Sequence, residues 1–225
     1  MKRKAQVTLI VVAALFILVI VALAIYAGNY FKKRSQEPLV FERASIENYV
    51  SNCVKLTSEE SLIQFGKRGF NVDSNKVLSI DEMQNQLASY VNSNLNPCLN
   101  DFEDFRKAGW GVENGDVNAK AQINEQDVGF DVSYPLKISN NENTISFERF
   151  ASKSNVRLKY IRELATKIVD FKFKYGKEVD LTTLRDYDLE VTIFPDKGSF
   201  VYVIDDHKSL IMNEPYRFVL RINQG

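Results

Sequence analysis

One histidine and two cysteines are the residues of this chain with the widest chemistry. His207 lies in the run Asp205-Asp206-His207-Lys208, and an imidazole beside carboxylates is a combination that binds metals or moves protons. Neighbouring residues of a turn point in different directions, however, and the chain has no second histidine to complete a zinc site. We therefore expect this run to be a solvated turn at the end of a strand, without a catalytic residue.

The two cysteines predict a disulfide rather than a reactive thiol. Cys53 and Cys98 fall on the inward faces of predicted helices, and neither belongs to a C-x-x-C pair. In an oxidising compartment a bond between them would stabilise the fold by roughly 4 kcal/mol. The alternative is a pair of buried, reduced side chains that pack as small apolar groups. A nucleophilic cysteine needs an activating partner, and the only histidine is far along the chain.

Oxygen-bearing side chains recur between residues 71 and 82 at a spacing that resembles the calcium loop of EF-hand proteins. The resemblance implies side-chain ligands from Asn71, Asp73, Asn75 and Glu82 and a carbonyl ligand from Val77. Lys76 replaces the glycine that such loops need for a sharp turn, and Asn71 replaces their first aspartate. Ser79 and Glu82 also fit a helix-capping box, which explains them without a metal. We expect no metal or cofactor. The alternative is a calcium ion bound by the residues of this loop.

The chain lacks the motifs of the common enzyme classes. It contains no G-x-S-x-G, no H-E-x-x-H, no P-loop and no G-x-G-x-x-G after a strand. Paired carboxylates cannot be located from sequence, so a membrane-tethered enzyme of unknown chemistry is the least favoured alternative. We expect the protein not to be an enzyme.

Charge argues against nucleic acid as a partner. Six of the 29 lysine and arginine residues lie in the first 34 positions, which contain no acidic residue. Residues 35–225 therefore carry 23 basic residues against all 29 acidic ones, a net charge of −6. Sequence-independent binding to nucleic acid depends on a basic surface, which this composition does not favour.

The apolar run Val7–Gly28 indicates where the protein resides. It has no charged residue and no polar stripe at the helical period, and at about 1.5 Å per residue it can cross a hydrocarbon core of about 30 Å. Three basic residues flank it on each side, so the positive-inside rule does not choose an orientation. A short cationic N-terminus is the costlier end to translocate. We expect residues 1–28 to be a transmembrane signal anchor, residues 29–43 a linker, and residues 44–225 an extracytoplasmic domain.

The N-terminal segment KRKAQVTLI resembles the class III signal segment of archaeal pilins and archaellins. The resemblance implies cleavage between Ala5 and Gln6 and assembly of the mature chain into a filament. Many pilins carry glutamate at the fifth mature position, where this chain has Ile10, and Pro38 interrupts the long helix that pilins use for packing. The layout of the whole chain is also similar to uncharacterised archaeal membrane-anchored proteins, a resemblance that implies no activity.

The first half of the domain predicts three helices. Apolar residues follow the helical period from Ser45 to Gly66, where the glycine would cap the C-terminus. A second helix opens with the capping box of Ser79 and Glu82. Asn96 and Pro97 predict the start of a third helix, which would end before Gly109.

After Trp110 the hydrophobic period changes to two residues, which predicts strands. The expected strands are 117–123, 128–134, 144–150, 189–194, 199–205 and 216–222, with a helix over 156–173 and a short helical turn from Asp180 through Leu184. Helices followed by two sets of strands indicate an α+β domain with a mainly antiparallel sheet. We expect a non-enzymatic, membrane-anchored envelope protein whose domain binds a protein, a glycan or another copy of itself. The alternative is a pilin-like filament subunit.

Overall fold

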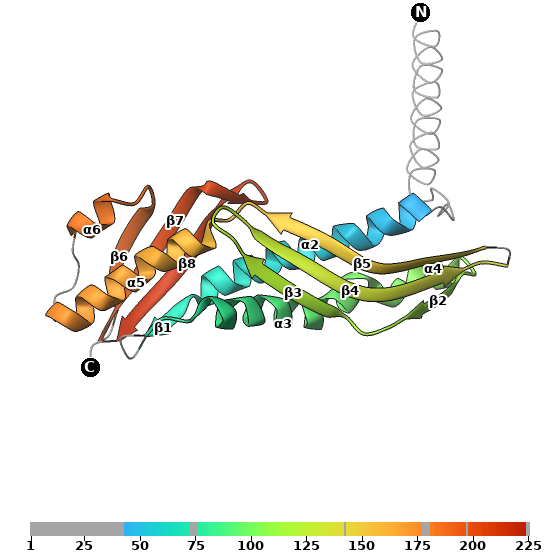
Figure 1. Cartoon of the computed structure of the whole chain (residues 1–225), viewed down its shortest axis with the longest axis horizontal. Coiled ribbons are helices and arrows are strands. Elements are labelled where there is room, and N and C mark those ends of the chain that lie inside the picture. The colour runs from blue at the N-terminus through green and yellow to red at the C-terminus, as the bar shows by residue number, and fades with distance from the viewer. Residues whose placement is uncertain (1–42, 73–75, 142, 177–180, 197, 224–225) are drawn as a thin grey trace, which may run out of the picture. The chain divides into compact units, whose positions relative to one another are not determined.

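The computed structural model describes residues 43–72, 76–141, 143–176, 181–196 and 198–223, which belong to one compact unit (Figure 1). The fold is α+β, as predicted. Its elements in chain order are α2 (Arg43–Arg68), β1 (Phe70–Val72), α3 (Ile80–Cys98), the 3-10 turn η1 (Asn100–Phe102), α4 (Glu103–Lys107), β2 (Gly111–Asn114), β3 (Asn118–Ile123), β4 (Val128–Ser139), β5 (Thr144–Ser154), α5 (Leu158–Tyr175), α6 (Leu181–Arg185), β6 (Glu190–Asp196), β7 (Ser199–Ile211) and β8 (Glu214–Asn223).

The strands form two four-stranded sheets instead of the single sheet that the sequence predicted. In the first sheet, β2 and β3 pair with one edge of β4 at different positions and β5 pairs with its other edge, all antiparallel. The second sheet has the order β1-β8-β7-β6, and only its β1–β8 pair is parallel. The predicted antiparallel character is confirmed. The sequence missed β1 and β2, because strands this short show no alternation of their own.

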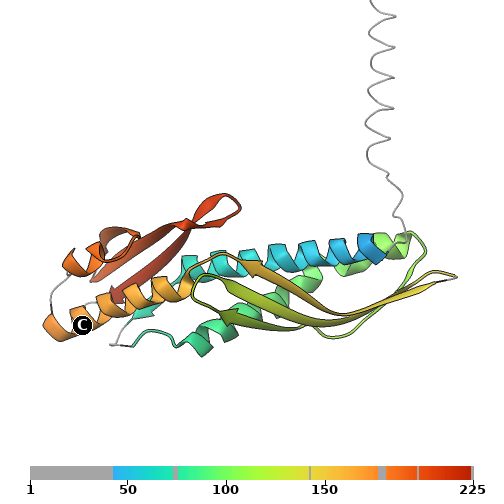
Figure 2. The ribbon, with the colours of Figure 1, turned by 45° about the horizontal axis from the view of Figure 1, so that its top comes forward.

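Helices α2 and α3 run side by side and contact the first sheet (Figure 2). Helix α2 contacts β5 and helix α3 contacts β3, where the side-chain oxygens of Asn92 and Gln84 accept hydrogen bonds from the backbone of Ala119 and Ile123. These bonds satisfy donors at the edge of β3 that would otherwise be open to another strand. Helix α2 also contacts β8, and the buried side chains of both sheets and of α5 belong to one hydrophobic core.

The predicted end of the first helix is wrong. Helix α2 continues through Gly66, where a Cβ would lie 2.2 Å from the backbone oxygen of Arg217, so this glycine permits close packing against β8. The helix ends at Arg68, and Gly69 takes the left-handed conformation with φ +58°. The amide of Gly69 donates to the oxygen of Phe65 at 2.7 Å, as in a helix C-terminal cap.

The predicted start of the third helix is also wrong. Helix α3 continues through Pro97, which falls in its last turn, and the side-chain oxygen of Asn96 accepts from the hydroxyl of Tyr134 at 3.0 Å instead of capping a helix. The chain then breaks at Asn100, Asp101 and Phe102, all of which have positive φ. The short elements η1 and α4 take the place of the predicted third helix.

The later elements agree more closely with the sequence. The predicted β3–β4 hairpin, the strand β5 and the helix α5 are present, and Gly176 caps α5 with φ +64°. The β6–β7 hairpin and β8 are also present, but β7 runs six residues past the predicted end at Asp205. Helix α6 lies in the predicted short turn, whose first residue, Asp180, is outside the described residues.

The predicted anchor, the linker up to residue 42 and the candidate cleavage site at Ala5 and Gln6 lie outside the described residues. Among the helices of the described part, none combines the length and apolar character needed to cross a bilayer.

Candidate functional site

The β7–β8 hairpin carries the least regular backbone of the second sheet. Its register shifts between Asp206 and Leu210, which marks a β-bulge, and Figure 2 shows the hairpin tip turned away from the rest of the sheet. The tip is a two-residue turn of Met212 and Asn213, with φ values of 52° and 67°. Turns of this kind favour glycine or asparagine, so methionine is an unusual residue at the first position.

A cavity of about 530 Å³ lies between this hairpin and the C-terminal half of α2. Part of its lining is apolar and comes from Ile63, Ile211, Met212, Pro215 and Tyr216. The charged or titratable part comes from Lys67, Glu190, Asp205, His207, Glu214 and Arg217. A volume of this size and a mixed lining are typical of ligand and partner sites, which makes this cavity the candidate functional site.

Four of these side chains contact each other in two pairs, Arg217 with Asp205 and His207 with Glu190. Arg217 donates from Nε to Asp205 Oδ1 at 2.8 Å and from its terminal nitrogen to Oδ2 at 3.0 Å. These hydrogen bonds raise the pKa of Arg217 above its usual value. The Nε2 atom of His207 lies 2.9 Å from Glu190 Oε2 on the neighbouring strand. Within the described residues, Lys67 and Glu214 belong to no ion pair, so they are the two charges of the cavity open to a partner.

Tyr216 fixes one wall of the cavity. Its hydroxyl is buried and donates to the backbone oxygen of Leu62 on α2 at 3.1 Å, which joins β8 to that helix. Burial raises the pKa of Tyr216 well above its ordinary value, so the phenol stays neutral. This tyrosine is a structural group and not a candidate acid.

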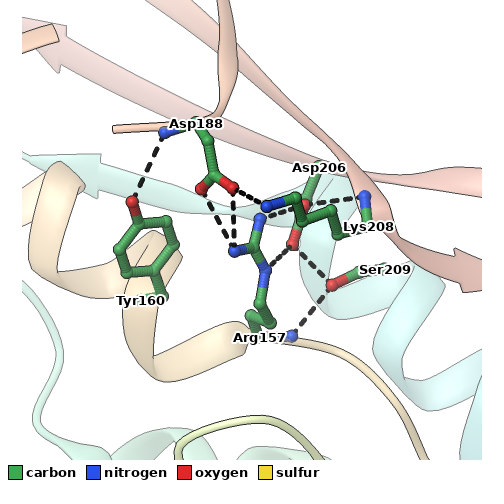
Figure 3. Close-up of polar contacts among 6 residues, drawn as sticks. All are labelled: Arg157, Tyr160, Asp188, Asp206, Lys208 and Ser209. Carbon is green, nitrogen blue, oxygen red and sulfur yellow. Dashed lines mark hydrogen bonds and ion pairs between the residues drawn. The ribbon is translucent and has the colours of Figure 1, made fainter. Parts of the chain in front are cut away.

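Asp206 lies on β7 between the cavity residues Asp205 and His207, and it is the centre of a buried polar cluster (Figure 3). Arg157, just before α5, donates to both carboxylate oxygens of Asp206, at 3.0 Å and 2.6 Å. Ser209 donates to the same carboxylate at 2.5 Å and accepts from the backbone amide of Arg157 at 3.0 Å. The bulge of β7 is therefore held to the start of α5 by a carboxylate whose two oxygens are both occupied.

Asp188 and Tyr160 complete the cluster (Figure 3). Asp188 pairs with Lys208 and accepts from Arg157 at 3.1 Å, and its backbone amide donates to the hydroxyl of Tyr160 at 3.4 Å. The hydrogen bond from Lys208, with a further one from Arg157, lowers the pKa of Asp188 to about 2. Burial alone would raise the pKa of Asp206, but the hydrogen bonds from Arg157, Ser209 and Lys208 outweigh it and the pKa is lowered. Both carboxylates are ionised and paired, which suits a structural clamp.

The structure corrects the prediction for the run 205–208. It is not a solvated turn but part of β7, and Asp206 is fully buried while His207 is exposed. The reason is the strand alternation: Asp206 points toward Arg157, and its neighbours Asp205 and His207 face the cavity. Among the described residues, no group of three histidine, cysteine, aspartate or glutamate side chains has the arrangement of a metal site.

Three of the five candidate calcium ligands, Asn71, Val77 and Glu82, lie within the described residues. Asn71 lies in β1, and Glu82 accepts from the backbone amide of Ser79 at 2.7 Å, a bond that lowers the pKa of Glu82. Ser79 accepts from the amide of Glu82 in return, so the predicted capping box is confirmed. Val77 is buried, and Asp73 and Asn75 lie outside the described residues.

The predicted disulfide is present. Cys53 in α2 and Cys98 at the end of α3 are bonded, with their Cα atoms 5.7 Å apart. Neither cysteine is free to act as a nucleophile in this state.

Sequence reasoning missed the cavity and the role of Arg157. Both depend on contacts between distant segments: Arg157 meets a carboxylate 49 positions away, and α2 meets a hairpin some 150 positions away. Nothing in the neighbouring sequence indicates that one aspartate in a run of charged residues is buried. Comparison of the chain with protein-family models, curated proteins and solved structures finds no match.

Proposed function

We propose that this protein is a membrane-anchored component of the cell envelope whose domain faces the extracytoplasmic side and acts by binding. In this proposal the run Val7–Gly28 holds the chain in lipid, and the domain binds a protein, a glycan or another copy of itself. The single observation that carries the proposal is the disulfide between Cys53 and Cys98. Disulfides form and persist mainly in compartments outside the reducing cytoplasm.

The cavity between α2 and the β7–β8 hairpin supports binding as the mode of action. It combines an apolar lining with two charges, on Lys67 and Glu214, that are outside every ion pair of the described residues. Its histidine and its aspartate are each paired with a neighbouring charge. A covalent step and a cofactor are not part of the proposal.

The alternative is a pilin-like subunit, and the segment around Ala5 and Gln6 is the observation that favours it. Cleavage there would leave a chain that begins with Gln6. Its apolar run would then pack with those of other subunits in a filament.

One intact-mass measurement on the chain from its native membrane tests both the membrane-anchored proposal and the pilin-like alternative. Cells are quenched with acid, free thiols are blocked with a maleimide, and the sample is measured before and after reduction. We expect a chain that retains residues 1–5 and accepts two maleimides only after reduction. Two maleimides bound before reduction would contradict the extracytoplasmic assignment, and a chain that begins at Gln6 would replace the anchor with the pilin-like alternative.

A further inference from the structure

The β7–β8 hairpin carries two large exposed apolar side chains: Met212, which lines the cavity, and Leu210, two residues before it in β7. Leu210 is 54% exposed and Met212 is 53% exposed, although most leucine and methionine side chains of the domain are buried. The adjacent cavity offers apolar groups from Ile63, Ile211 and Pro215. A projecting apolar group and a partly apolar hollow therefore lie next to each other on one surface.

The backbone conformation of Met212 costs free energy. With φ at 52°, Met212 has the left-handed conformation, which is unfavourable by about 1–2 kcal/mol for a residue with a Cβ and unrestricted for glycine. About half of the Met212 side chain is exposed, so its packing offsets only part of this cost. Strained residues of this kind often lie at active sites, ligand clamps and switch regions.

The unpaired charges of the cavity have opposite signs and come from different elements. Lys67 lies on α2 and Glu214 begins β8, and they do not pair with each other. A surface that carries one unpaired cation and one unpaired anion can form two ion pairs with a second copy of itself. If two such surfaces meet across a twofold axis, Lys67 of one copy faces Glu214 of the other, and the reciprocal pair forms as well.

We propose that the cavity is the contact surface between two copies of this chain, related by a twofold axis, with the Leu210 and Met212 side chains of each copy seated on the cavity of the other. This proposal rests on the binding role proposed above and names its partner. The patch is small, so the pair is weak in solution. Attachment of both copies to one membrane raises their effective concentration and favours pairing there.

Sedimentation velocity of the full chain in detergent micelles, over a range of concentrations, measures the pairing. In a twofold pair, Lys67→Glu places like charges opposite each other twice, and Glu214→Lys does the same with the opposite sign. We expect each variant to weaken the dimer by about tenfold or more. The double variant restores both attractions with reversed polarity. An equimolar mixture of the two single variants restores both attractions in the mixed pair, one reversed and one with the original polarity, so both samples should pair like the wild type. Lys120→Glu, an exposed charge reversal on β3, is the matched control and leaves the dimer unchanged.

Met212→Gly separates association from folding. Glycine suits the left-handed turn and removes the projecting side chain, so the variant unfolds at the same or a higher temperature than the wild type while its dimer is weakened. This result would exclude damage to the fold as the cause of the lost pairing.

The proposal is overturned if the full chain is monomeric at every concentration, or if neither charge reversal weakens the dimer. It is also overturned if the double variant and the mixture fail to restore pairing. A monomeric chain with an oxidised disulfide and a retained N-terminus would remove the self-association surface and leave the membrane-anchored binding role in place.

Discussion

At the scale of single residues, the burial of Asp206 has a large energetic consequence. Its carboxylate is fully buried, and the Arg157 side chain that pairs with it is only 13% exposed. Asp206→Ala would leave that guanidinium without its main partner. We expect a loss of about 3–5 kcal/mol in the free energy of unfolding, measured by urea denaturation.

Asp131 provides the matched control for this measurement. It also pairs with an arginine, Arg149, but both side chains lie largely in solvent. Asp131→Ala should therefore cost no more than about 1 kcal/mol. Equal losses in the two variants would contradict the assignment of the Arg157–Asp206 contact as a buried clamp.

The same cluster predicts how stability changes in acid. The pKa of Asp188 is lowered to about 2 in the folded protein, below the ordinary value of about 3.9 that it takes in the unfolded chain. The unfolded state therefore binds the proton first, so this contribution is complete above about pH 4 and is lost as the pH falls through about 2. We expect the stability difference between the wild type and Asp188→Asn to shrink over that interval in urea titrations. A difference independent of pH would show that the Asp188 carboxylate does not act as a paired charge.

The run from Asp205 to Lys208 shows the limit of sequence reasoning at this scale. Four charged or polar residues in succession predict a solvated turn, and every local rule supports that interpretation. The strand continues because Arg157, which is remote in sequence, neutralises Asp206 inside the fold. Capping at Ser79 and Glu82, by contrast, depends on residues three positions apart and was predictable.

At the scale of secondary-structure elements, Gly69 and Gly176 form a natural comparison. Both follow a helix and have positive φ, but a Cβ at Gly69 would lie 1.6 Å from the backbone oxygen of Val219, while one at Gly176 would meet nothing within 4 Å. Gly176→Ala should cost about 1–2 kcal/mol from backbone strain alone. Gly69→Ala should cost at least about 3 kcal/mol, because β8 must also move. Thermal unfolding of both variants checks this, and similar losses would contradict the close packing of α2 against β8.

The disulfide acts between the helices α2 and α3. It joins residues separated by 45 positions, and a loop of this length predicts a stabilisation of about 4 kcal/mol in the loop-entropy model. The variant with both Cys53→Ser and Cys98→Ser should lose about that amount in urea denaturation. A reductant should lower the stability of the wild type and leave the double variant unaffected. If reduction has no effect on the wild type, the bond does not contribute to the fold.

The elements that sequence predicted well have strong local signals. The β3–β4 and β6–β7 hairpins combine alternating strands with polar turns, and α5 has a regular apolar stripe with Gly176 after it. The elements that the sequence did not predict have no such local signal. Strand β1 exists because β8 pairs with it. Pro97 lies in the last turn of α3 although proline lacks the amide that continues a helix, which the local sequence does not predict.

At the scale of the whole domain, α2 connects the two sheets. It contacts β5 in one sheet and β8 in the other, and it carries one cysteine of the disulfide and one wall of the cavity. The change of hydrophobic period near Trp110 predicted the order of helices and strands. It could not predict two sheets, because strand pairing and the path of α2 depend on contacts between distant segments.

Protease treatment of intact cells tests the central claim, an extracytoplasmic domain held by an N-terminal anchor, most directly. A broad-specificity protease is added to intact cells and to lysed cells, and the domain is followed with an antibody together with a cytoplasmic marker protein. We predict that the domain is digested in intact cells while the cytoplasmic marker is preserved. Complete protection of the domain in intact cells, with digestion only after lysis, would contradict the account.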